Sequence, residues 1–208
     1  MTRLFAVVAA VVTVQRASAQ VASLPDNPRG TARRQVALSD GWLVKQLDTD
    51  KPEVAALARE SASPDQTWLA ARMPAQVHDV LLEHGLIPDP HIGTNAAASA
   101  WVGEKDWAYV CRFPTPGNIR GPAFLRFQGL DTLADVWLNG AALGHFKNMF
   151  REYAVEVKGS LLPAGQPNVL VIVFSSPLRY TREAGRRPGE PGAAPHQSLR
   201  KCFSDFSS

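Results

Sequence analysis

Five segments between Trp107 and Ser176 have the length and composition of β-strands, and the period of two in this region limits the possible fold more than any other feature. They are strand-length, rich in β-branched and aromatic residues, and bounded by Pro, Gly or Asn: WAYVCRF, AFLRFQGL, LADVWLN, EYAVEV and NVLVIVFSS. Such alternation is typical of half-buried β-strands. Short strands at this spacing predict antiparallel pairing and an all-β fold, a β-sandwich of the jelly-roll type.

Two of these segments predict more than a strand. In LADVWLN, Ala134, Val136 and Leu138 point to one side, and Asn139-Gly140 accepts the positive φ angles of a type I′ turn, so a β-hairpin is expected. The segment from Val169 to Phe174 is apolar at every position. We therefore expect it to be a central strand that is covered on both faces.

The region before Trp107 adds two strands and little helix. LSDGWLVKQLD and TWLAARM are predicted strands, and the segment Lys51 to Ala62 looks like an insertion with a short helix. The best helix is PAQVHDVLLEHG, with Pro74 in its first turn and Gly85 at its end. Its apolar face comprises Val77, Val80, Leu81 and His84. The predicted fold class is all-β with this one short helix.

The amino-terminal residues have the organisation of a secretory signal peptide. Arg3 precedes an apolar run from Leu4 to Val14, and Ala17-Ser18-Ala19 is a small-x-small cleavage site. We expect removal of this peptide and a secreted or periplasmic protein, lysosomal in a eukaryote. The run is shorter than a membrane span, and no later segment is long enough to be one. The predicted divisions are a signal peptide (1–19), an irregular arm (20–37), the jelly roll (38–178), and a Pro/Gly/Arg-rich loop with the end of that domain (179–208).

Charge and titratable residues argue against several classes of function. The net charge of +3 falls to +1 without Arg3 and Arg16, and the basic excess lies in the Pro/Gly-rich tail, so no nucleic-acid surface is predicted. The five histidines lack paired ligand spacing, and neither a metal site nor a cofactor is predicted. The two cysteines favour a buried free thiol at Cys111 and a loose one at Cys202, with a bridge between them as the alternative.

Several motifs occur in an order that carries a family resemblance. From Leu38 to Phe206 they are MPAQVHDVLLEHGLIPDPHIGTN, WVGEKDWAYVCRF, FQGLDTLADVWLNGAALG, NMFREY and LRKCFSDF. Together they resemble the amino-terminal domain of β-mannosidases, in glycoside hydrolase family 2. The Gly-Leu-Asp-Thr strand and the Leu-Asn-Gly hairpin occur across family 2, whereas Ile-Pro-Asp-Pro, Asn-Met-Phe and Arg-Lys point to the mannosidase branch. The resemblance implies a galactose-binding-like jelly roll.

The resemblance also implies where catalysis takes place. In the family this domain precedes an immunoglobulin-like domain and a (β/α)₈ barrel, whose two glutamates, about 5 Å apart, hydrolyse terminal β-mannosyl residues with retention. A barrel needs roughly 250 residues, so we assign no catalytic residue here. Family members continue from the Arg-Lys motif into Gly-Trp-Asp-Trp-Gly and a closing strand, whereas Phe206 is followed here by Ser207-Ser208. We therefore expect a fragment whose jelly roll lacks its last strand. A further departure is Asn95-Ala96, where family members usually have Asn-Glu.

Asn148 is the one candidate substrate-binding residue. The resemblance places the corner after the hairpin over the mouth of the barrel, where an amide with donors and an acceptor suits sugar hydroxyls. A turn-forming role for Asn148 is the alternative. Trp101, Trp107 and Trp137 are either sugar-stacking platforms or core and interface aromatics. We favour the second role, with Trp137 packed on a neighbouring domain.

Three other polar residues are assigned framework roles. His78 and Asp79, within the predicted helix, are read as part of the family framework and not as a catalytic pair. Asp131 is expected to pin a strand end through local backbone hydrogen bonds, as Asx residues do.

Three functions follow from these observations. The first is a non-catalytic amino-terminal portion of a β-mannosidase-like glycoside hydrolase, whose partners are β-mannosides or mannooligosaccharides bound through the intact parent enzyme, with no nucleic-acid partner and no membrane partner after signal cleavage. The second is a free-standing carbohydrate-binding module. The third is a fragment of another family 2 exo-glycosidase, such as a glucosaminidase.

Overall fold

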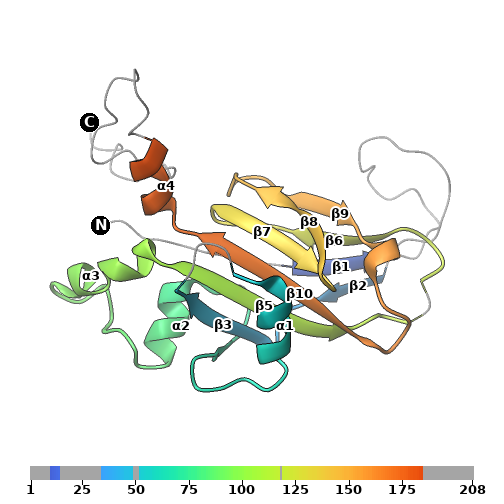
Figure 1. Ribbon diagram of the computed structural model, residues 1–208, viewed down its shortest axis with the longest axis horizontal. Coiled ribbons are helices and arrows are strands. Elements are labelled where there is room, and N and C mark those ends of the chain that lie inside the picture. The colour runs from blue at the N-terminus through green and yellow to red at the C-terminus, as the bar shows by residue number, and fades with distance from the viewer. Residues whose placement is uncertain (1–9, 15–33, 49–51, 118, 185–208) are drawn as a thin grey trace.

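The strands of the protein form two antiparallel sheets (Figure 1). The computed structural model describes residues 10–14, 34–48, 52–117 and 119–184. The larger sheet has the strand order β4-β3-β5-β10-β7-β8, and the smaller has the order β2-β1-β6-β9. All neighbouring strands pair in antiparallel fashion. The predicted all-β sandwich is confirmed. The described residues hold four short α-helices, of which the sequence predicts two, one in the insertion from Lys51 to Ala62 and one after Pro74.

All five period-two segments become strands. The larger sheet consists of β3 (Trp42–Leu47), β4 (Leu69–Ala71), β5 (Asp106–Pro114), β7 (Leu133–Leu138), β8 (Ala141–Phe146) and β10 (Pro167–Ser175). The smaller sheet consists of β1 (Ala10–Val14), β2 (Arg34–Ala37), β6 (Ala123–Phe127) and β9 (Tyr153–Glu156). The longest strands, β5 and β10, pair side by side within the larger sheet, and β3 and β7 flank them. The centre of the larger sheet is therefore formed by two strands whose residues are mostly buried.

The main core lies on the inward face of the larger sheet. It joins alternate residues of the strands to helix α2 (Val77–Glu83), and its fully buried members include Val44, Tyr109, Leu125, Phe127 and Ile172. The predicted inward residues of β7, namely Ala134, Val136 and Leu138, are also fully buried. Burial of one Leu- or Phe-sized side chain contributes about 1.5–3 kcal/mol. This core is what brings the two sheets together.

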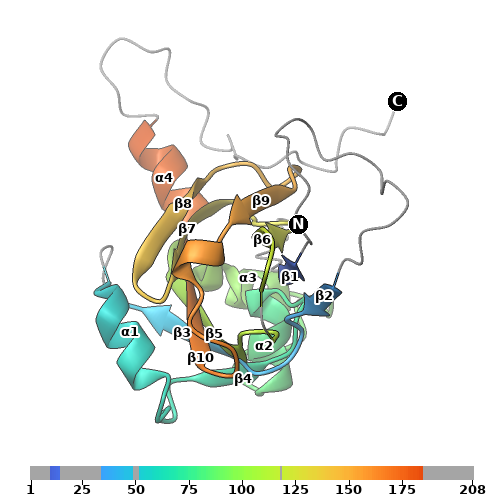
Figure 2. The ribbon, with the colours of Figure 1, turned by 90° about the vertical axis from the view of Figure 1, so that its right-hand side faces the viewer.

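Helix α1 (Val54–Glu60) covers the central part of the outer face of the larger sheet, so the central strands are covered on both faces. A second apolar cluster joins Leu57 of α1 to Trp68 and to outward residues of β5 and β10. In Figure 2, α1 lies on one side of the larger sheet while β1 and β2 lie on the other. Strand β10 contributes Leu170 and Ile172 to one cluster and Val171 and Val173 to the other. The prediction of a strand apolar on both faces is confirmed.

Trp137 belongs to this second cluster. Its ring is partly buried against the cluster that α1 covers, and Trp137 lies opposite Val171 in the pairing of β7 with β10. The ring is thus partly covered within the domain itself, and the expectation that Trp137 also packs on a neighbouring domain stays a prediction. Helix α1, in the insertion between β3 and β4, belongs to the same cluster as Trp137. These segments are far apart in the sequence, so local periodicity does not predict that they share a cluster.

The hairpin between β7 and β8 turns at Asn139-Gly140 as predicted. The φ angles of these residues are 53° and 84°, which a type I′ turn requires. Asn139 also anchors the hairpin, because its Nδ2 donates to the Ser160 carbonyl at 2.7 Å and its Oδ1 accepts the Val169 N–H at 2.8 Å. A register shift between Val136 and Trp137 marks an irregularity in the ladder to β8.

The helices differ from prediction mainly at their ends. Helix α2 begins at Val77 after Gln76, and Pro74 lies before it and follows a cis peptide bond, so Pro74 is not in the first turn. Gly85, with φ of 68°, follows the end of α2 as predicted. His84 is exposed rather than part of the apolar face. The other helical elements are α3 (Asn95–Ala98), η1 (Ala100–Glu104), η2 (Lys158–Ser160) and α4 (Pro177–Ala184).

Two predicted irregular segments contain regular structure. Residues 34–37 of the expected arm form β2, whose pairing partner β1 is distant in sequence. Residues 179–184 of the expected loop belong to α4. The remainder of both segments, residues 20–33 and 185–208, lies outside the described residues, as does Cys202. Strand β1 falls within the expected signal peptide, which stays a prediction. No helix within the described ranges is long and apolar enough to cross a membrane.

Candidate functional site

Asn148 lies at an exposed corner between β8 and β9. Its Oδ1 accepts the N–H of Phe150 at 2.9 Å, and its main-chain carbonyl accepts the hydroxyl of Tyr153 at 3.1 Å. The amide oxygen therefore closes an Asx turn, which is the alternative role considered for this residue. Among the described residues, no protein acceptor is bonded to its Nδ2, which leaves two donors at the surface. The two roles of Asn148 are compatible, because they use different atoms of one side chain.

The corner rests on aromatic side chains. Phe146 and Tyr153 lie with ring centroids 4.5 Å apart, and Phe146 also contacts the fully buried Phe127 at 6.0 Å. The guanidinium of Arg151 lies 6.0 Å from the Tyr153 ring centroid. Phe150 itself is 76% exposed. This anchored backbone presents an amide, an aromatic face and a cation to solvent, a combination that suits a polar ligand with apolar CH faces.

Trp101 and Trp107 form a tilted pair with ring centroids 6.3 Å apart, but their surroundings differ. Trp107 is buried, and its indole N–H donates to the Val102 carbonyl at 3.0 Å, as expected of a core aromatic. Trp101 is 38% exposed and borders a shallow groove of about 260 Å³. The groove lining is mainly apolar, with Leu86 and the polar Gln46 and Gln66 among its residues. For Trp101 the favoured role as a core or interface aromatic stays a prediction, with sugar stacking as the alternative.

Several carboxylates form ion pairs that hold the fold together. Glu60 pairs with Lys45, Glu104 with Arg182, and Glu152 with Arg126. These pairs link α1 to β3, η1 to α4, and the segment before β9 to β6. Within the described part of the chain, no three His, Cys, Asp or Glu side chains cluster as metal ligands would. The absence of catalytic, metal and cofactor sites stays a prediction for the chain.

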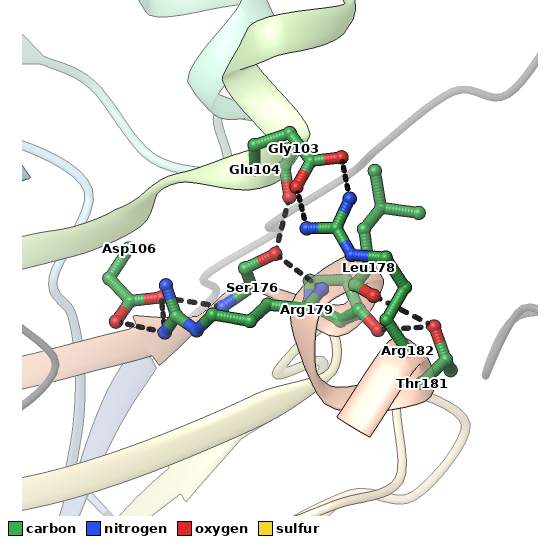
Figure 3. A network of polar contacts seen from close by, with 9 residues as sticks. Gly103, Glu104, Asp106, Ser176, Leu178, Arg179, Thr181 and Arg182 are labelled. Atoms are coloured by element: carbon green, nitrogen blue, oxygen red, sulfur yellow. Dashed lines mark hydrogen bonds and ion pairs between the residues drawn. The ribbon is translucent and has the colours of Figure 1, made fainter. Parts of the chain in front are cut away.

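A buried carboxylate that the sequence did not reveal fixes α4 to the sheet (Figure 3). The Asp106 side chain is 2% exposed, and Nη2 of Arg179 donates to both of its oxygens at 2.7 and 2.6 Å. The N–H of Ser176 donates to the same carboxylate at 2.6 Å. The Ser176 hydroxyl donates to the Gly103 carbonyl and accepts the N–H of Arg179, which makes Ser176 the N-cap of α4. We call this set, Gly103, Asp106, Ser176 and Arg179, the α4 clamp.

The framework residues behave in different ways. Asp131 is buried, and its carboxylate accepts the Thr132 hydroxyl. His78 is half-buried and Asp79 exposed on α2, and the Asp79 carboxylate contributes to the raised pKa of the Tyr109 phenol, after the larger effect of burial. Cys111 is a buried free thiol, as expected, and burial raises its pKa to about 12. A thiol of this kind is inert as a nucleophile at neutral pH.

The two stacked antiparallel sheets, the helix-covered outer face and the exposed corner after an Asn-Gly hairpin define a galactose-binding-like β-sandwich domain. The sequence model described as "Glycosyl hydrolase 2 galactose-binding domain-like" matches residues 42–207. The chain therefore belongs to this family of glycoside hydrolase family 2 domains.

Individual relatives agree with this assignment. The chain is 43% identical over 120 residues to β-mannosidase B of Thermothelomyces thermophilus, covering 57% of this chain and 14% of that protein. It is 34% identical over 151 residues to β-mannosidase B of Emericella nidulans, covering 72% and 16%. The crystal structure of β-D-mannosidase from Dictyoglomus thermophilum matches with a TM-score of 0.58 and 29% identity, covering 74% of this chain and 18% of that one. The chain thus spans less than one fifth of each relative.

Proposed function

We propose that the chain is the non-catalytic amino-terminal portion of a β-mannosidase-like glycoside hydrolase that acts on terminal β-mannosyl residues. The unequal coverage of the two chains in each comparison supports this proposal, because most of this chain matches only a small part of several β-mannosidases. In this proposal the substrates are β-mannosides or mannooligosaccharides, reached through the parent enzyme. The amino-terminal signal pattern further supports export of the parent by secretion, into a periplasm or, in a eukaryote, to lysosomes.

A domain exchange tests the proposal. Residues 10–207, which include β1 and β2, would replace the matching segment of the Dictyoglomus thermophilum enzyme. Hydrolysis of p-nitrophenyl β-D-mannoside would be measured for the chimera and for the 208-residue chain alone. We expect activity in the chimera and none in the chain. Turnover by the chain alone would contradict the non-catalytic assignment. A folded but inactive chimera, beside an active parent, would contradict the link to mannosidases.

The role of Asn148 in that chimera is tested by two substitutions. Asn148→Asp keeps an oxygen for the Phe150 N–H but removes the amide donors, whereas Asn148→Ala removes both. If the donors bind sugar, both variants raise KM by roughly three- to tenfold, the equivalent of about 0.5–1.5 kcal/mol for one hydrogen bond. Only Asn148→Ala is expected to lower stability, by about 1 kcal/mol. An unchanged KM in both variants would leave Asn148 as a turn residue alone.

Calorimetry on the 208-residue chain separates the proposal from a free-standing carbohydrate-binding module. We expect no saturable binding of mannose or mannooligosaccharides, because the one exposed corner supplies few contacts and sugar sites need several convergent polar groups. Saturable binding by the chain alone would favour the module instead.

A further inference from the structure

Strand β1 occupies an interior position in the smaller sheet, between β2 and β6. It pairs antiparallel with β2, from Val11 opposite Ala37 to Val14 opposite Arg34. It also pairs antiparallel with the whole of β6, from Ala10 opposite Phe127 to Val14 opposite Ala123. Both ribbon views place β1 beside β2 in this layer (Figures 1 and 2). Among the described strands, β1 is the only one that pairs with β2.

The same residues form part of the apolar run of the predicted signal peptide. One molecule cannot use them in both ways, because removal of residues 1–19 takes away the interior strand. Strand β2 would then lose its pairing partner, and β6 would keep only β9. Backbone N–H and C=O groups left unpaired beside the fully buried Ala123, Leu125 and Phe127 are costly, and an open edge of this kind is a template for another strand.

We propose that the position between β2 and β6 is a β-strand binding site, held by Ala10–Val14 while residues 1–19 are attached and taken by an extended apolar peptide strand when they are absent. Binding occurs by strand addition, in which main-chain hydrogen bonds supply affinity and alternate side chains supply selectivity. The inference does not depend on the activity of the parent enzyme.

The register defines the ligand. It is about five residues long and antiparallel to both neighbours, as β1 is. Alternate positions lie opposite Ala123, Leu125 and Phe127, whose side chains belong to the main core, so apolar residues are required there. The intervening position opposite Arg126 meets a guanidinium that Glu152 already pairs with. A charged side chain in the ligand would therefore find no unpaired counter-charge at Arg126, so the site favours apolar strands.

The test uses the full chain and a labelled peptide with the sequence of residues 8–16, extended by two lysines for solubility. In the wild-type chain, tethered β1 competes at an effective concentration on the order of millimolar, so weak peptide binding is expected. Val12→Pro removes a central N–H from β1 and opens the site. Fluorescence anisotropy should show binding to this variant at least about tenfold tighter than to wild type. The matched control is the same peptide carrying Val12→Pro, which should not bind.

Hydrogen exchange supplies a second measurement. In the Val12→Pro chain, amides of β6 should exchange roughly tenfold or more faster than in wild type, and added peptide should restore their protection. If the variant does not fold, peptide present during refolding should recover a monodisperse folded chain, and the proline peptide should not. The proposal is overturned if the peptide binds wild type and variant equally, if it binds neither, if the exchange of β6 does not respond, or if refolding is not rescued.

Discussion

At the scale of single residues, the structure uses two asparagines to connect segments that are distant in sequence. Asn168 is fully buried, and its amide nitrogen donates to the Phe113 carbonyl at 3.2 Å and the Thr115 hydroxyl at 2.8 Å. Its Oδ1 accepts hydrogen bonds from the Leu162 N–H and from the side chain of Asn139, both at 2.9 Å. A buried amide with all of these bonds made stabilises a unique arrangement, and it becomes costly when a partner is removed.

Asn139 is therefore expected to matter beyond its turn conformation. Asn139→Gly accepts the positive φ angle equally well but removes hydrogen bonds to Ser160, Asn168 and Val169. We expect the free energy of unfolding to fall by about 2 kcal/mol, measured by urea denaturation. The matched control is Ala141→Gly, an exposed position just after the turn, with an expected loss of about 1 kcal/mol or less. Equal losses in the two variants would show that backbone flexibility accounts for the effect.

Cys111 predicts how stability responds to alkaline pH. Burial raises its pKa from an ordinary value near 9 to about 12, so above pH 9 the unfolded chain gives up this proton more readily than the folded one. The contribution of the buried Cys111 thiol to the free energy of unfolding is fully present below pH 9, and it is lost as the pH rises toward 12. We expect the free energy of unfolding to be about 1 kcal/mol lower at pH 10 than at pH 8. Cys111→Ala should flatten this decline, and parallel pH curves for the two chains would contradict the assignment.

At the scale of elements, most strands and the helices α1 and α2 follow from the sequence, whereas β2 and α4 do not. Alternation and continuous apolar runs are local properties, so β5, β6, β7, β9 and β10 are visible in the sequence itself. Strand β2 and helix α4 were missed because their partners are distant, although Ser176-Pro177 is a recognisable helix start. Asn148 was predicted as a substrate-binding residue from the family resemblance alone, and the hydrogen bond that closes its turn is seen only in the structure. Asp106 gave no signal, since its partner Arg179 is 73 residues away.

The α4 clamp contains a buried ion pair, and this predicts an unequal effect of two ion-pair substitutions. Asp106→Ala leaves the Arg179 guanidinium and the Ser176 N–H without their acceptor, with an expected loss of about 3 kcal/mol in the free energy of unfolding. Arg182→Ala breaks the exposed pair with Glu104 and should cost about 1 kcal/mol or less. Denaturation midpoints of both variants test this, and similar losses would mean that the burial of Asp106 contributes little.

At the scale of the whole molecule, exposed apolar side chains concentrate in one stretch of the chain. Four of the seven large apolar side chains that the structure shows as exposed lie in the segment from α2 to η1: Leu82, Leu86, Ile92 and Trp101. Exposed apolar patches commonly mark contacts with another surface, or promote association when that surface is absent. We therefore expect the isolated chain to associate with itself through this region.

Self-association tests that expectation. The double variant Leu86→Gln/Ile92→Gln should remain monomeric at a concentration several-fold higher than the wild-type chain, as measured by light scattering. Leu162→Gln, which changes a side chain of 37% exposure outside that stretch, is the matched control and should behave as wild type does. Association that responds equally to both changes would show that it depends on general surface polarity.

The α4 clamp also sets an order of events during synthesis. Asp106 leaves the ribosome 73 residues before Arg179, and at about 5–20 residues per second this separation corresponds to roughly 4–15 seconds. During that interval β5 cannot bury its first carboxylate with a counter-ion, because α4 and the end of β10 do not yet exist. The larger sheet is therefore completed only after α4 has been synthesised. A pause in translation between these two codons prolongs the time that Asp106 spends without its partner.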